Sequence, residues 1–272
     1  MGQHGKHWPL VMQKGRFGYL LALLAALWVG DAVAQSDTPC RQALALGLDV
    51  SGSVDEGEYR LQLDGLAAAL EQPDVQRALL SQPDRPIQIA VYEWSGPAHQ
   101  RLLQDWVAIT DQTVVFSVAD RLRRTARIKA DPSTGIGAAM IYGQRLLAGR
   151  DCLTRTLDIS GDGPANTGPR PQDVRYLSGF DGITINGLVI GAGDADTDLV
   201  TYYKELVIHG FGRFVEQAAD FRDYEDAMAR KLLRELMGVV VSDLQQLRQT
   251  KPPSRYIGSD PSNTVPPAST RY

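Results

Sequence analysis

The sequence predicts an α/β fold: a doubly wound, mostly parallel sheet of six strands with helices on both faces, as in Rossmann-like domains. Short apolar segments alternate along the chain with segments of helical periodicity, which is the pattern of repeated strand–helix units. The segment 183–190 is dense in β-branched residues, which is typical of a central strand. Polar motifs directly follow two of the apolar segments, where doubly wound sheets bind their ligands.

The strands are read from apolar segments of suitable length. The segment 102–109 is expected to be an edge strand, because a short turn at Gly96-Pro97 joins it to the strand before it. The predicted strands are 43–48, 87–92, 102–109, 154–159, 183–190 and 213–216.

The helices are read from apolar residues at helical spacing. In the first helix, Tyr59, Leu63 and Leu66 form one apolar face. Three prolines between residues 73 and 86 predict a loop before the second strand. The predicted helices are 55–70, 112–125, 135–148, 171–177, 198–208 and 220–247.

The two ends of the chain differ from the predicted domain, 35–248. Residues 1–34 have a basic start, an apolar run and the small-residue motif Ala32-Val33-Ala34, which is the layout of a secretory signal peptide. The apolar run is too short for a membrane-spanning helix, so we expect no stable membrane anchor and an exported protein, periplasmic or secreted. Residues 249–272 are rich in Pro and Ser and are predicted to be a disordered tail.

Export makes a disulfide between the two cysteines plausible. Cys40 and Cys152 each precede a predicted strand, so they share one edge of the sheet if those strands are parallel neighbours. A bridge would close a loop of 112 residues and stabilise the fold by about 4 kcal/mol. Two free, buried thiols are the alternative.

Two carboxylates are expected to meet at the opposite edge. Asp49 follows the first predicted strand and Asp162 follows the fourth. In a sheet of order 3-2-1-4-5-6, the strand order reverses between strands one and four, and ligands bind at that reversal. The topology therefore makes Asp49 and Asp162 neighbours.

Hydroxyl groups accompany these carboxylates. Asp49 opens an Asp-x-Ser-x-Ser turn with Ser51 and Ser53, and Thr134 lies in a loop before a predicted helix. Such oxygen ligands suit Mg²⁺ best, with Mn²⁺ or Ca²⁺ possible. The alternative is that the serines, like Asp55, only cap the helix that follows.

These five residues carry a resemblance. The chain resembles a von Willebrand factor type A domain, whose metal-ion-dependent adhesion site has the pattern Asp-x-Ser-x-Ser, then Thr, then Asp. It is more similar still to a family of exported bacterial proteins of unknown function with that fold. The resemblance covers roughly residues 43–245 and implies a metal site whose open position accepts a carboxylate from a protein partner.

Asp158 lies inside the strand that leads to Asp162, where a buried carboxylate needs a partner. One interpretation is that Asp158 orients the metal loop or a metal-bound water from outside the ligand set. The other is that its side chain is solvated or satisfied locally.

Three functions follow from these observations. The first is an exported, metal-dependent binding module that captures an acidic group of a protein partner. The second is a Mg²⁺-dependent phosphoester-processing enzyme, although Ser51 stands where the second Asp of an Asp-x-Asp motif would be. The third is a metal-free scaffold.

Removing residues 1–34 takes away three basic residues and one acidic residue and changes the net charge from −4 to −6. Since no basic patch is visible, nucleic acid is not an expected partner.

Overall fold

The computed structural model describes residues 40–191 and 197–250, and the predicted signal peptide and nearly all of the predicted tail lie outside these residues. The strands form one sheet in the order β3-β2-β1-β4-β5-β6, which confirms the predicted fold class and strand order. All neighbouring strands are parallel except β2 and β3. The strands are β1 (Cys40–Asp49), β2 (Ile87–Trp94), β3 (Gln100–Ile109), β4 (Cys152–Gly161), β5 (Ile183–Ile190) and β6 (Val215–Ala218).

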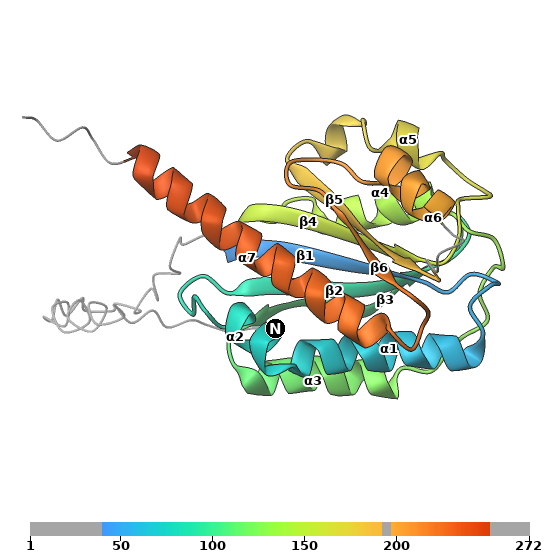
Figure 1. Ribbon diagram of the computed structural model, residues 1–272, viewed down its shortest axis with the longest axis horizontal. Helices are drawn as coiled ribbons and strands as arrows, with labels where there is room; N and C mark the ends of the chain where they lie inside the picture. The colour runs from blue at the N-terminus through green and yellow to red at the C-terminus, as the bar shows by residue number, and fades with distance from the viewer. Residues whose placement is uncertain (1–39, 192–196, 251–272) are drawn as a thin grey trace, which may run out of the picture. The chain divides into compact units, whose positions relative to one another are not determined.

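Helices cover both faces of this sheet (Figure 1). One apolar core lies between the sheet and α1 (Glu56–Glu71), α2 (Pro73–Leu79), α3 (Gln112–Arg124) and α7 (Tyr224–Thr250). A second core lies on the other face, under α4 (Ile136–Leu147), α5 (Pro171–Val174) and α6 (Thr197–Tyr202). Short helical segments also occur at η1 (Ser178–Phe180) and η2 (Tyr203–Val207).

Side chains at alternate positions of β1 pack into the two cores on opposite faces of the sheet. Leu44, Leu46 and Leu48 pack into the first core, whereas Ala43 and Ala45 pack into the second. Every residue of β1 is buried. Because both faces of the strand are covered, the middle of β1, residues 43–48, is continuously apolar instead of alternating polar and apolar residues.

The disulfide is confirmed. Cys40 and Cys152 are paired in register at the start of β1 and β4, with their Cα atoms 4.4 Å apart. Because parallel strands start at the same edge of the sheet, the bridge lies at the edge opposite to the end of β1, where Asp49 is found.

Several predicted elements were wrong in detail. The segment after Gln72 is the helix α2 and not a loop, because Pro73 occupies the first helical turn, where its missing N–H group costs nothing. The helix predicted over 198–208 changes to a π-helix at Tyr203.

The last helix starts at Tyr224 and not at Asp220. The Asp220 carboxylate accepts backbone N–H groups of Arg222 and Asp223 and so holds a turn before the helix. The last strand, predicted over 213–216, is β6 at Val215–Ala218. Within the described residues, no helix is long and apolar enough to cross a membrane.

Candidate metal centre

Three hydrogen bonds fix the backbone at the end of β1. The Asp49 carboxylate accepts the N–H of Ser51 at 2.8 Å, and the carbonyl oxygen of Asp49 accepts the side-chain amide of Gln62 on α1 at 2.9 Å. The N–H of Gly52 donates to the carbonyl oxygen of Pro132, 2.9 Å away, in the loop that carries Thr134. These bonds fix the Asp49 loop against both α1 and the loop before α4.

The structure brings all five predicted side chains together. The Ser51 hydroxyl lies 3.4 Å from the hydroxyls of both Ser53 and Thr134. Ser53 donates a hydrogen bond of 2.8 Å to the carboxylate of Asp162. Asp49 and Ser51 are buried, whereas Ser53 is exposed, so the cluster opens to solvent on the side of Ser53 and Asp162.

The Asp49 carboxylate is fully buried, and its Oδ2 atom has no hydrogen-bond partner. Burial raises the pKa of this carboxyl, the N–H of Ser51 lowers it and the charge of Asp162 raises it, and together they bring it from 3.8 to about 7. No basic side chain in the described residues forms an ion pair with Asp49 or Asp162. The oxygen cluster with an unpaired buried carboxylate atom fits a bound cation, which would favour the charged form of Asp49.

Tyr203 lies beside this unpaired oxygen. Its ring is buried where α6 changes to the π-helix, and its hydroxyl also has no hydrogen-bond partner. A Cβ atom on Gly161 would lie 2.5 Å from the Tyr203 hydroxyl and 3.0 Å from Asp49 Oδ2, which explains why a glycine stands there. Tyr203 could not be predicted from sequence patterns, because its position depends on the change from α6 to the π-helix.

Two further residues, Asn166 and Gln62, support the loops from outside the cluster. Asn166 fixes Thr134 by two hydrogen bonds of 2.9 Å, one to each backbone polar group of the threonine. Gln62 supports Asp49 from α1, where it is completely buried. A polar residue on the apolar face of a predicted helix was the available signal for Gln62.

The helix-capping alternative has a direct structural answer. Asp55 is the N-cap of α1: its carboxylate accepts the N–H of Glu58, and the Glu58 carboxylate accepts the N–H of Asp55, each at 2.8 Å. This is a complete capping box. Ser51 and Ser53 are therefore not needed as caps, and their hydroxyls face the carboxylates instead.

Asp158 lies elsewhere. It is buried on the α7 side of the sheet and forms an ion pair with Lys231, which also binds Glu235 at 2.7 Å. The contacts found for Asp158 in the described residues join β4 to α7 and not to the five clustered side chains. Local satisfaction of its charge, the second of the two interpretations, describes this arrangement.

Metal ligation at the cluster would depend on oxygen atoms of mixed type. No group of three or more His, Cys, Asp and Glu side chains in the described residues could hold a metal ion. The cluster instead combines two carboxylates with three hydroxyls, which is a ligand set for a hard cation and not for a thiolate- or imidazole-bound metal.

The sheet order and this cluster define a von Willebrand factor type A-like domain. The chain belongs to the family described as "Protein of unknown function (DUF1194)", whose profile matches residues 39–240. A search of curated proteins gives no match.

Solved structures support the fold. Proximal thread matrix protein 1 from the mussel byssus, "with zinc occupied MIDAS motif", is similar with a TM-score of 0.53 and 15% identity over 73% of this chain and 48% of that one. A von Willebrand factor type A protein from Catenulispora acidiphila gives 0.52 and 15% over 73% and 43%. The PilB minor pilin from Streptococcus sanguinis gives 0.53 and 12% over 73% and 62%. The matched region spans less than two thirds of each of these proteins.

Proposed function

We propose that this protein is an exported, metal-dependent binding module that captures an acidic group of a protein partner. The observation that carries the proposal is the Asp49 carboxylate, buried with an unpaired oxygen and clustered with Ser51, Ser53, Thr134 and Asp162. A buried charge without a partner is costly, so a site of this kind is expected to be balanced by a cation.

Each of the five residues has a definite part in this proposal. Asp49 and Asp162 supply two negative charges, and Ser51, Ser53 and Thr134 supply neutral oxygens. When bound, a divalent cation would supply a positive centre that attracts a carboxylate of the partner. The three hydroxyls add no negative charge, so these ligands do not weaken that attraction as further carboxylates would. Hard oxygen ligands favour Mg²⁺, with Mn²⁺ and Ca²⁺ as substitutes.

The structural neighbours agree with this proposal. One is a matrix protein whose metal-ion-dependent adhesion motif is occupied by zinc, and another is a pilin. The Cys40–Cys152 bridge supports an oxidising compartment and therefore export. A binding function needs no catalytic group in addition to the five clustered side chains.

The first test is the thermal stability of residues 35–272 in EDTA and then in Mg²⁺, Mn²⁺ and Ca²⁺. We expect the metals to raise the melting temperature of the wild type and to leave that of Asp49→Asn unchanged. Asp84→Asn, which neutralises an exposed carboxylate before β2, is the matched control and should respond as the wild type does.

The second test is capture of peptides. Two immobilised libraries, identical except for a central aspartate or asparagine, are incubated with the protein in Mg²⁺ or EDTA. Capture of the aspartate library only, and only in Mg²⁺, is expected. Equal capture of both libraries, or a melting temperature that no metal changes, would refute the proposal.

A further inference from the structure

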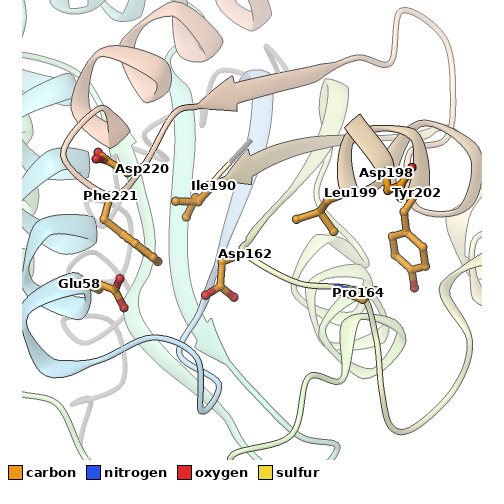
Figure 2. A pocket seen from close by; sticks show the side chains of 10 residues that line it. Glu58, Asp162, Pro164, Ile190, Asp198, Leu199, Tyr202, Asp220 and Phe221 are labelled. Atoms are coloured by element: carbon orange, nitrogen blue, oxygen red, sulfur yellow. The ribbon is translucent and has the colours of Figure 1, made fainter. Parts of the chain in front are cut away.

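A cavity of about 530 Å³ lies next to the candidate metal centre and shares Asp162 with it. Its volume is in the range of ligand pockets, about 300–1,000 Å³. The lining side chains come from α1, the loop after β4, the end of β5, α6 and the turn before α7 (Figure 2).

The cavity combines an apolar wall with acidic groups. The apolar part includes Ile190 and Phe221, which are both buried, together with Leu199 and Tyr202 from α6. The acidic groups are Glu58, Asp162, Asp198 and Asp220, and none of the described residues that line the cavity is basic. An occupant that matches both parts must be apolar along its length and positively charged at its end.

These acidic groups are poorly balanced by the chain itself. Asp220 is paired with Arg222 at 2.6 Å, whereas the described residues contain no ion pair for Glu58, Asp162 or Asp198. A divalent cation would balance Asp49 and Asp162 and would leave Glu58 and Asp198 uncompensated. An isolated carboxylate that approached the metal centre would be repelled by these two groups.

We infer that this cavity binds a lysine or arginine side chain of the protein partner, next to the carboxylate that the metal centre captures. The methylene stem of either side chain fits along Ile190, Leu199 and Phe221, and its charged head meets the carboxylates. The rings of Phe221 and Tyr202 offer additional cation–π contacts. The basic side chain also offsets the repulsion that the partner's carboxylate meets.

This inference rests on the proposed function for the partner's carboxylate, but the cavity itself can be tested without metal. The probe is the carboxylate-free peptide acetyl-Lys-Phe-Lys-amide, titrated in EDTA into residues 35–272 and followed by amide NMR shifts. We expect weak binding, with shifts at Glu58, Ile190 and Phe221, and a marked loss of affinity at high salt.

The pocket variant is the triple substitution Glu58→Gln, Asp198→Asn and Asp220→Asn. A glutamine still serves the capping box of α1, so the helix should keep its start. The matched control neutralises three exposed carboxylates that precede the strands at the opposite edge of the sheet: Asp84→Asn, Asp151→Asn and Asp181→Asn. Both variants change the net charge equally, and circular dichroism checks that both are folded.

The pocket variant should bind the probe about tenfold more weakly than the wild type, and the control variant should bind it nearly as the wild type does. Equal binding by the wild type and the pocket variant, or no binding by the wild type, would overturn the inference. In the Mg²⁺ capture experiment with the aspartate library, Lys and Arg should be enriched beside the aspartate by the wild type and not by the pocket variant. Metal-dependent capture without this enrichment would keep the proposed function and reject the cavity's role.

Discussion

The molecule contains two pairs of carboxylates that are balanced in different ways. Asp158 and Glu235 are buried between β4 and α7 with Lys231, which forms ion pairs with both. Asp49 and Asp162 lie at the carboxyl end of the sheet, where no basic side chain in the described residues forms an ion pair with either. Lys231 supplies the first pair with a counter-charge from within the chain. The second pair is accompanied by the hydroxyl groups of serine and threonine instead of a basic side chain.

A stabilising cluster differs from a binding site in whether the chain itself supplies the counter-charge. The α7 cluster is closed: Lys231 is completely buried, and the amide of Asn186 donates to Glu235 at 2.6 Å. The Asp49 cluster is open at Ser53 and keeps an unpaired oxygen inside. Buried carboxylates alone do not indicate a ligand, but buried carboxylates without an internal cation do.

The largest expected effect concerns the internal cation. Lys231→Met should lower the free energy of unfolding by about 3–5 kcal/mol, because it leaves Asp158 and Glu235 buried together without a counter-charge. Urea unfolding at pH 7 measures the loss, which should be the same with and without Mg²⁺. Arg230→Met is the control: Arg230 is half exposed and pairs with Glu216, so its loss should be below about 1 kcal/mol. A loss that Mg²⁺ restored would show that the two clusters are not independent.

The second prediction is a pH dependence at the open cluster. The pKa of Asp49 is raised in the folded protein to about 7 from 3.8, so its contribution to stability is present at low pH and is lost as the pH rises through 7. In EDTA this loss should be on the order of 4 kcal/mol between pH 4 and 8. The Asp158 pKa is also raised, by burial and by Glu235, and contributes a decline of the same sign. The difference between wild type and Asp49→Asn, measured by urea unfolding at each pH, isolates the Asp49 part.

Saturating Mg²⁺ provides the control for that pH series. It should remove most of the Asp49 part, because ionised Asp49 would then have a counter-charge. The part that belongs to Asp158 should remain. Identical pH profiles for the wild type and Asp49→Asn in EDTA would contradict the raised pKa of Asp49.

The meeting of Asp49 and Asp162 could be predicted from the sequence, whereas the pairing of Asp158 with Lys231 could not. Asp49 and Asp162 follow apolar strands, and the rule for strand order at the reversal places them side by side. The Cys40–Cys152 bridge followed from the same topology. Lys231 and Glu235 stand at i,i+4 positions on the buried face of α7, but which strand faces them depends on how a long helix crosses the sheet. Helix α2 was missed because Pro73 was interpreted as a loop residue and not as a first helical residue.

The third prediction separates the two clusters by metal. At a Mg²⁺ concentration one hundred times its dissociation constant, bound metal should stabilise the wild type by about 2.7 kcal/mol. Asp158→Asn should keep this gain, because Asp158 contacts α7, and Asp162→Asn should lose most of it. Isothermal titration with Mg²⁺ gives the affinities directly. An equal loss of Mg²⁺ affinity in both variants would instead support the interpretation in which Asp158 orients the metal loop.

The smallest effect concerns a third carboxylate, Asp55, which accepts the backbone N–H of Glu58 and does not pair with a basic side chain in the described residues. Asp55→Ala should cost about 1 kcal/mol of unfolding free energy in EDTA and the same in Mg²⁺, because it removes the N-cap of α1. Ser53→Ala, two residues earlier, should change stability little in EDTA and should weaken Mg²⁺ binding. Thermal unfolding of both variants under both conditions checks the pair. If Ser53→Ala instead behaved as Asp55→Ala does, the Asp-x-Ser-x-Ser turn would serve the helix alone, because a cap acts on the backbone whether or not a metal is present.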